Sequence, residues 1–412
     1  MKTLLLSFFL LMSNLMISQS IKVLFDASKA ESAGNADWVI DADSHNIGYG
    51  NGPAAIGSGN ESNPQRFPTP AQSGITNSTS ESYWKGSLSA WGIDCVKQGY
   101  QVETLPYNVP ITYGTSNVQD LSNYNVFVVD EPNIRFTTAE KTALMNFVQN
   151  GGGLFMVSDH CVSDRNNDGW DSPQIWNDFM KYNSVQTNPF GITFDSANFS
   201  ETSANIPTLP NDSLLHGPMG NAAEVMWTNG TSMTLYPSLN NTVKGIVYKT
   251  GSAHGNTGVM AAYARYGNGK VTAIGDSSPT DDGTGDSNDV LYNGWTNDAN
   301  GNHERLIMNA TIWLAASSPL TTGIESSINI NSTIHIYPNP LTTSATIEIE
   351  TAKKIDNATF KIIDILGNEV KTIENINSNK FIFEKEELKS GIYFFNCSDK
   401  KKIIGQGKFI IN

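Results

Sequence analysis

Tyr124-Asn125-Val126-Phe127-Val128-Val129-Asp130 is a short apolar run that ends in a carboxylate, as expected of a buried β-strand. Residues 137–149 follow as a predicted helix, which Thr137 and Glu140 begin with the spacing of a capping box. The next apolar run is Leu154-Phe155-Met156-Val157-Ser158. Strands that alternate with helices in this way favour a parallel sheet covered by helices on both faces.

The same alternation extends in both directions from this segment. The further predicted strands and helices are 21–26, 80–99, 100–105, 258–266, 270–275 and 303–316. Residues 159–245 are polar and rich in Asn, Pro and Gly, and they predict small β-elements and loops built over the sheet. We therefore expect an α/β domain over residues 21–317, with a doubly wound, mostly parallel sheet of the flavodoxin-like kind.

Both ends of the chain differ from this domain in composition. Residues 1–20 have a lysine at position 2, an apolar centre and small residues at the end, the pattern of a removable signal peptide. Residues 318–333 are rich in Ser and Thr without an apolar period, which predicts a linker. Residues 334–412 then show short alternating strands, which predict a small all-β sandwich.

Charge and composition exclude some classes of partner. The net charge is -14, with 26 Lys and Arg against 40 Asp and Glu, so a nucleic-acid backbone would be repelled and we expect no nucleic-acid partner. No run after residue 20 is apolar enough to span a bilayer, so no transmembrane segment is expected. Acidic loops suit hard cations such as Ca²⁺, and no organic cofactor is expected.

Several ordered motifs mark the C-terminal segment. They are Tyr337-Pro338-Asn339-Pro340, Ile363-Asp364-Ile365-Leu366-Gly367 and residues 388–394, followed by a closing strand with basic residues. With these motifs, residues 334–412 resemble the type A sorting domain of the type IX secretion system. The resemblance implies the type IX machinery as a partner, and a protein that is secreted or attached to the cell surface. A carbohydrate-binding sandwich is the alternative.

The large domain also carries a family resemblance. The segments concerned are the strand ending at Asp26, residues 126–132, Ser158-Asp159-His160, Gly275-Asp276-Ser277 and residues 309–315. In these the domain resembles the class I glutamine-amidotransferase-like superfold, nearest to its trehalose-utilisation-like and gliding-protein-like branches. The resemblance implies a fold and does not by itself imply an activity.

Ionisable and nucleophilic side chains follow the ends of the predicted strands, where ligands of such sheets bind. The candidate catalytic residues are Asp159, His160, Cys161 and Asp276, and Asp26 and Glu131 are candidate substrate contacts. Carboxylates crowded together would raise one another's pKa or hold a cation. The alternative is that they cap the helices that follow.

His160 and Cys161 suggest different chemistry. The superfold's amidotransferases place their nucleophilic cysteine after the equivalent strand, which implies a thiolate at Cys161 with a histidine as base. The glycines of the nucleophile elbow are absent here, because Val162 and Ser163 follow the cysteine. The resemblance to the trehalose-utilisation-like arrangement implies His160 as the preferred acid, base or metal ligand.

An acidic loop over residues 164–171 has the alternating oxygen donors of a calcium loop. Asp164, Asn166 and Asp168 alternate before Gly169, and Asp171 or Asp178 is a candidate for the missing ligand. The twelfth position of an EF-hand loop would be Ile175 instead of Glu, so a complete EF-hand is excluded. A plain turn rich in Asp and Asn is the alternative.

A second acidic loop, residues 276–289, lies between segments that carry His254 and His303, which suggests a weaker site for zinc or another transition metal. His254 is also a candidate substrate contact. Trp170 and Trp295 fall in the predicted loops, where an indole ring can stack on a sugar.

These features favour an exported hydrolase of a polysaccharide or glycoconjugate, with water activated by Asp159, His160 or Asp276 and with calcium holding the loop at 164–171. A non-catalytic glycan-binding or envelope-binding protein is the first alternative. A peptidase or amidase that uses Cys161 is the second.

Overall fold

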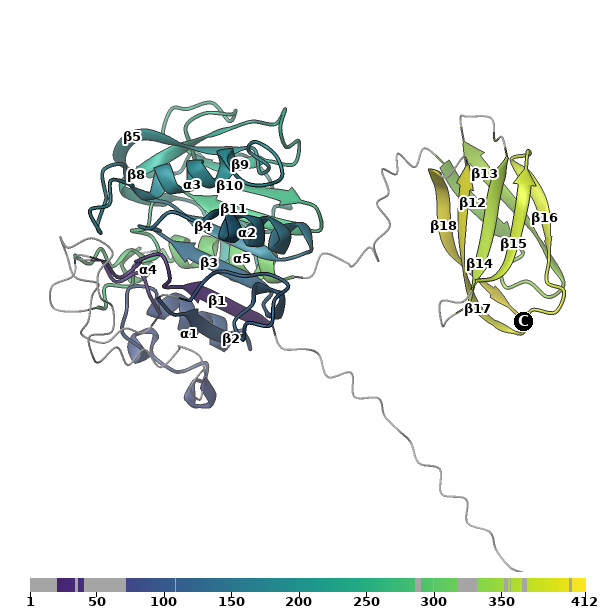
Figure 1. Ribbon diagram of the computed structural model, residues 1–412, viewed down its shortest axis with the longest axis horizontal. Coiled ribbons are helices and arrows are strands. Elements are labelled where there is room, and N and C mark those ends of the chain that lie inside the picture. The colour runs from purple at the N-terminus through teal and green to yellow at the C-terminus, as the bar shows by residue number, and fades with distance from the viewer. Residues whose placement is uncertain are drawn as a thin grey trace, which may run out of the picture. The chain divides into compact units, whose positions relative to one another are not determined.

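The apolar run at 126–130 forms a strand at the middle of a large sheet, as its composition predicts. The computed structural model describes residues 21–33, 36–40, 72–107, 109–285, 290–298, 300–316, 332–351, 355, 357–364, 369–399 and 402–412. It divides into two compact units, residues 1–320 and 321–412 (Figure 1). The expected signal peptide and residues 318–331 of the expected linker lie outside the described residues.

Five parallel strands form one half of a nine-stranded sheet in the large unit. In their order across the sheet, they are β2 (Gln101–Leu105), β1 (Lys22–Asp26), β3 (Val126–Asp130), β4 (Gly153–Val157) and β11 (Gly269–Ile274). Their side chains are almost all buried, as expected of strands covered on both faces.

Helices cover both faces of this half-sheet. Helices α1 (Ser89–Lys97) and α5 (Asn302–Ala315) share one core with alternate strand side chains such as Val126 and Val128. Helices α2 (Thr138–Gln149) and α3 (Ser172–Lys181) share the other core with Phe127 and Val129. Successive strand residues point to opposite faces, so one apolar strand supplies both cores.

The capping box expected at the start of α2 is present. The Thr137 hydroxyl accepts a hydrogen bond from the Glu140 amide, and the Glu140 carboxylate accepts one from the Thr137 amide. Gly151 follows the helix with φ +116°, a conformation that favours glycine. By contrast, the helix expected over 80–99 begins only at Ser89, after a 3-10 turn at Glu81–Tyr83.

The second half of the sheet is antiparallel, which corrects the expectation of small β-elements over residues 159–245. Antiparallel strands continue the sheet from β11: β10 (Val259–Tyr266), β8 (Val225–Leu235), β5 (Ile192–Ser203) and β9 (Lys244–Tyr248), the last of which pairs with β10. The terminal strand β5 pairs with β8 through two register shifts, between Phe194 and Asn198 and between Phe199 and Glu201. Two short strands, β6 (His216–Gly217) and β7 (Gly220–Asn221), form a separate hairpin.

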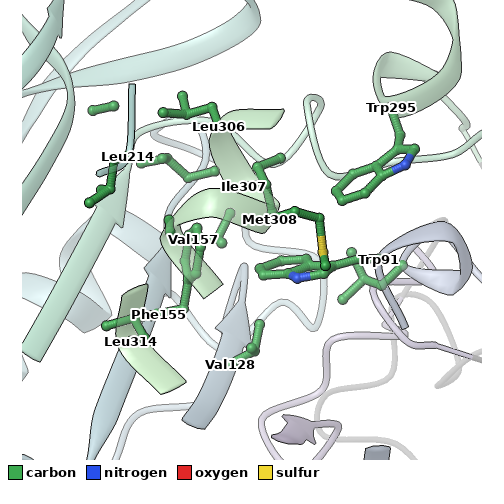
Figure 2. Close-up of a cluster of buried hydrophobic side chains, with 14 of the residues drawn as sticks. Trp91, Val128, Phe155, Val157, Leu214, Trp295, Leu306, Ile307, Met308 and Leu314 are labelled. Atoms are coloured by element: carbon green, nitrogen blue, oxygen red, sulfur yellow. The ribbon is translucent and has the colours of Figure 1, made fainter. Parts of the chain in front are cut away.

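The core on the α1 and α5 side is built around an aromatic cluster. Figure 2 shows Trp91 in the middle of this cluster, with Trp295 on one side and Phe155 on the other. The Trp91 ring centroid lies 4.8 Å from that of Phe155 and 5.3 Å from that of Phe25, both edge-on. Its Nε1 donates to the Thr311 hydroxyl at 3.0 Å, so the one polar atom of this buried side chain is satisfied.

The smaller unit consists of the antiparallel strands that the sequence predicts. One sheet contains β12 (Ser332–Tyr337), β13 (Ser344–Thr351) and β16 (Lys380–Glu384), and the other contains β15 (Glu369–Ile376), β14 (Ala358–Ile363), β17 (Gly391–Asp399) and β18 (Lys402–Ile411). Ile347 and Phe383 from the first sheet share a core with Phe360 and Phe395 from the second. In the described part of both units, no helix is long and apolar enough to cross a membrane.

Candidate functional site

The candidate site lies where the parallel strands β1, β3, β4 and β11 end (Figure 1). The polar residues at these ends are Asp26, Asp130, Glu131, Asp159, His160, Asp276 and Ser277. All of them except His160 are buried. The sheet therefore gathers the expected strand-end residues at one edge, most of them away from solvent.

His160 is the most accessible of these groups, and its partner is Asp159. The Nδ1 atom of His160 lies 2.6 Å from Oδ2 of Asp159, and the two side chains are 23% and 4% exposed. Burial alone lowers the pKa of His160, but the hydrogen bond and charge of Asp159 outweigh burial, so the net shift is upward. A buried carboxylate behind an accessible imidazole orients the ring and leaves Nε2 as the nitrogen that can meet a ligand.

Glu131 is buried and held in an unusual backbone conformation. Its φ is +44°, in the left-handed region. A non-glycine residue in this conformation costs about 1–3 kcal/mol of folding free energy, which contacts with the surrounding residues must offset. Ser277 Oγ donates to its Oε2 at 3.0 Å, and Arg165 pairs with both carboxylate oxygens. Burial raises the pKa of Glu131 to about 7; Arg165 opposes this shift, and the charge of Asp159 adds to it.

Arg165 joins the two acidic groups. A guanidinium nitrogen lies 3.6 Å from Oδ2 of Asp159, and the side chain is 11% exposed. The Arg165 amide donates to the Asn133 side chain, and that side chain donates to the Glu131 carbonyl oxygen. Asn133 therefore links the backbone of Arg165 to the backbone of Glu131. No pattern in the sequence predicts Arg165 as a member of the site. The signal that could have identified it is the need of buried carboxylates for a nearby cation.

Asp276 accepts hydrogen bonds from strand β8 and from the segment after β11, and Asp130 accepts one from that same segment. Asp276 accepts from the Thr228 amide and from the amide of Ser278, the latter at 2.9 Å. Asp130 accepts from the Thr280 hydroxyl at 2.7 Å. Burial raises the pKa of both carboxyls. Where the structure describes the chain, no helix begins directly after β3 or β11, so these two carboxylates hold loop and strand backbone and do not cap a helix.

Asp26 lies in a separate acidic pair with Glu31, a residue that no pattern in the sequence predicts as part of the site. Burial raises the pKa of both groups, and the charge of Asp26 raises that of Glu31 further. Asp26 accepts the Ser28 amide at 2.9 Å, and Glu31 accepts the Lys29 amide at 2.8 Å. Two buried carboxyls so coupled are expected to share one proton at neutral pH.

Cys161 lies beside His160 in the chain, but its thiol is not activated. Its Sγ is 3.9 Å from the Asp195 carbonyl oxygen. Burial raises the pKa of Cys161 to about 11, and the charges of Asp171 and Asp159 add to the shift. The thiol therefore stays protonated at neutral pH, which is unfavourable for a nucleophile.

The loop at 164–171 is closed by its own hydrogen bonds. Asp164 accepts the amides of Asp168 at 3.0 Å and Gly169 at 2.7 Å, and Gly169 has φ +91°. Asn166 is fully buried, and its Oδ1 has no hydrogen-bond partner within the described structure. Asp171 caps α3 through the Gln174 amide and also accepts the Val162 amide, so both of its oxygens are already engaged.

Three other residues were predicted to contact the substrate: Trp295, Trp170 and His254. Each is either buried by other side chains or lies away from the strand ends. Trp295 is only 2% exposed and stacks on Trp91 at 6.3 Å, so it belongs to the core and the expected sugar-stacking role is wrong. It turns inward because α4 (Gly294–Asn297) packs against α5. Trp170 has the Arg135 guanidinium 3.9 Å from its ring centroid. His254 is exposed, and its contacts are with Asn205 at 2.8 Å and with Tyr248.

The second acidic loop forms structural contacts where it is described. Asp282 accepts the Ala90 amide at 2.8 Å, and Asp286 and Asp289 lie outside the described residues. His303 is buried, with Nε2 accepting the Met226 amide at 2.8 Å and Nδ1 lying 3.0 Å from the Gly294 carbonyl oxygen. Among the residues for which a position is described, no three His, Cys, Asp or Glu side chains converge as metal ligands.

Comparisons with solved structures give only distant likenesses. The cytoplasmic protein STM3548 from Salmonella typhimurium is 11% identical with a TM-score of 0.38, over 71% of this chain and 98% of that one. The mmIFT52 N-terminal domain is 11% identical with a TM-score of 0.37, over 54% and 88%. A β-galactosidase from Rahnella sp. R3 is 12% identical with a TM-score of 0.32, and the match spans 71% of this chain but only 36% of the galactosidase. These values assign no activity.

The C-terminal unit gives a clearer result. No curated protein sequence matches the chain. Residues 335–412 match the family model of the secretion system C-terminal sorting domain. The chain therefore carries a type IX sorting domain, which indicates export followed by secretion or attachment to the cell surface.

Proposed function

We propose that the large unit is an exported hydrolase that acts on a polysaccharide or glycoconjugate. The observation that carries the proposal is the accessible His160, paired at 2.6 Å with the buried Asp159 and lying beside Arg165 at the strand ends. The sorting domain supports a substrate outside the cell.

In the proposed reaction, Nε2 of His160 accepts a proton from the attacking water. The imidazolium then returns this proton to the leaving oxygen of the substrate as the bond to that oxygen breaks. Asp159 stabilises the imidazolium that forms, and Arg165 stabilises negative charge on the substrate oxygen. Glu131 positions Arg165. Glycoside hydrolysis by paired carboxylates needs two carboxyls that reach the substrate. Because Glu131 and Asp276 are both 0% exposed, we favour histidine-based hydrolysis, with these carboxylates as positioning residues.

Replacing His160 with glutamine is expected to lower kcat about 100- to 10,000-fold, the usual contribution of a positioned acid or base. Activity should rise with pH as His160 loses its proton, with a midpoint above the ordinary value of 6.5. Asp159→Asn should move this midpoint to lower pH, because it removes the group that raises the pKa. The measurement is kcat/KM against pH on chromogenic polysaccharide esters and glycosides, with His254→Gln as the control.

Full activity in His160→Gln would rule out this mechanism. Retention of glycans by the wild-type protein without turnover of any of these substrates would instead favour the non-catalytic binding function. Loss of activity on thiol alkylation would favour the cysteine-dependent alternative, against the raised pKa of Cys161.

We also infer that the large unit is a variant of the class I glutamine-amidotransferase-like superfold. Its five parallel strands follow the order β2-β1-β3-β4-β11, with helices packed on both faces. This order corresponds to the doubly wound flavodoxin-like arrangement. The antiparallel strands β10, β8 and β5 are then an addition at one edge of the sheet.

We further propose that the loop at 164–171 binds Ca²⁺ through Asp164, Asn166 and Asp168. The buried and unpartnered Oδ1 of Asn166 supports an oxygen-seeking cation. Asp164 and Asp168 accept hydrogen bonds within the loop, so the cation would share or replace those bonds, whereas Asp171 holds the start of α3. Calcium at about 100 times its Kd should stabilise the protein by about 2.7 kcal/mol. Metal analysis and melting temperatures with calcium and with chelator test this. If calcium raises the melting temperature of Asp164→Ala/Asp168→Ala as much as that of the wild type, the loop is only a turn.

A further inference from the structure

A cavity of about 660 Å³ lies in the large unit away from the strand-end site. Its lining includes Asp212, Lys244, Tyr263, Arg265 and Trp313. This volume falls within the range of small-molecule sites, about 300–1,000 Å³. Nothing in the proposed hydrolysis uses it.

The cavity and the strand-end site lie toward opposite ends of β11. Arg265 pairs with Lys270 near the start of this strand, whereas Asp276 follows its end. Six residues of extended chain span roughly 20 Å. A ligand in the cavity would therefore not touch His160 unless it were a polymer.

The local charge of the cavity is opposite to that of the chain. Lys244 and Arg265 are both exposed at the cavity, in a protein of net charge -14. Asp212, the carboxylate in the lining, accepts hydrogen bonds from the Tyr263 hydroxyl at 2.9 Å and the Leu214 amide at 3.0 Å. The lining thus holds two cations against one carboxylate that is bound within the protein, so the cavity favours an anion.

Two aromatic rings form part of the lining. Tyr263 and Trp313 are half-buried, with ring centroids 5.1 Å apart. The Arg265 guanidinium lies 5.4 Å from the Trp313 ring and the Lys244 ammonium 6.0 Å from the Tyr263 ring. Half-buried rings offer apolar surface to a sugar, while neighbouring groups such as Asn241 and Thr242 can bond its hydroxyls.

We propose that this cavity binds an acidic saccharide, a sugar unit that carries a carboxylate or sulfate. Lys244 and Arg265 bind the anionic group, and the edge of the Trp313 and Tyr263 pair contacts the sugar ring. The inference does not depend on hydrolysis, because binding here requires no group of the strand-end site. On a polymer, the cavity would hold one unit while another unit occupies the other end of the sheet.

The test is calorimetric titration of the full chain with trigalacturonic acid, a sulfated disaccharide, neutral maltotriose and a short polyglutamate peptide. We expect binding of at least one acidic saccharide and much weaker binding of maltotriose and polyglutamate. Lys244→Gln/Arg265→Gln should weaken that binding about 10- to 100-fold, as expected when charge-assisted hydrogen bonds are lost. The binding should also weaken as salt is added.

Lys181→Gln is the matched control, since it removes an exposed cation from α3 on the other side of the sheet and should leave the affinity unchanged. Trp313→Leu should weaken binding of the acidic saccharide and change the melting temperature of the protein by no more than a few degrees from the wild-type value. The proposal is overturned if neither acidic saccharide binds, if maltotriose or polyglutamate binds as tightly, or if the double variant binds like the wild type. His160→Gln should bind normally, so failure of the hydrolase proposal remains distinguishable.

Discussion

Replacing Arg165 with methionine is expected to lower the free energy of unfolding of the large unit by about 3–5 kcal/mol. Methionine preserves much of the side-chain volume but leaves the Glu131 carboxyl, which is 0% exposed, without its cation. The loss should depend on pH. The folded pKa of Glu131, already raised to about 7, should rise further, whereas the unfolded chain keeps the ordinary value of 4.5.

Between those two pKa values the folded state binds more protons than the unfolded state, so stability falls as pH rises. Below pH 7 the wild type shows the same fall, because its own Glu131 pKa is about 7. The difference between Arg165→Met and the wild type should therefore be nearly constant from pH 5 to pH 6 and grow above pH 7. Urea unfolding followed by tryptophan fluorescence measures it. All 8 tryptophans precede the linker, so the signal reports on the large unit alone.

The matched control adds Glu131→Gln to the Arg165→Met variant. The amide removes the buried charge and can still accept from Ser277, so most of the loss should be recovered. A loss that is the same at every pH, and that the second substitution does not recover, would show that Arg165 acts by packing alone.

Truncating Trp91 to alanine is expected to cost about 3–5 kcal/mol, the range found for large aromatic residues in protein cores. Trp91 is fully buried and contacts the rings of Phe25, Phe155 and Trp295. These neighbours come from β1, β4 and α4. A cavity at Trp91 would therefore weaken the packing of α1 against the sheet and against α4.

Trp91→Phe is the comparison variant, and the same urea titration measures it. It keeps a ring in the cluster and loses the hydrogen bond to Thr311, whose hydroxyl still donates to the Ile307 carbonyl at 2.8 Å. We expect it to cost about 1–2 kcal/mol. A cost below 1 kcal/mol for Trp91→Ala would mean that the cluster repacks freely.

The parallel half of the fold could be predicted because its signals are local. The strand at Val126–Asp130, the capping box at Thr137 and the next strand each follow from a few adjacent residues. Helix α3 was missed although Asp171 and Gln174 have capping-box spacing, because Asp171 was interpreted as a metal ligand. The structure joins β10 to β11 by a tight turn after Tyr266, so these two strands pair antiparallel, and the expectation of a mostly parallel sheet understated the antiparallel part.

The strand-end carboxylates of the site were also predictable, since parallel strands that end in polar residues bring them to one edge. Arg165 and Glu31 were not predicted as members, because they come from loops whose paths no periodic pattern determines. The cavity beside Trp313 was missed for a related reason. It depends on the long segment between β5 and β9, where sequence periodicity is weak.

The two register shifts in β5 affect how readily copies of this protein associate through the edge of the sheet at high concentration. A long, regular strand at the rim of a sheet is a template on which another molecule can add its own strand, and irregular pairing with local twist disfavours such growth. Copies of an exported protein that is concentrated on a cell envelope would collide with one another frequently. The bulged β5 is therefore expected to act against self-aggregation, so that crowded copies stay separate and keep their loops accessible.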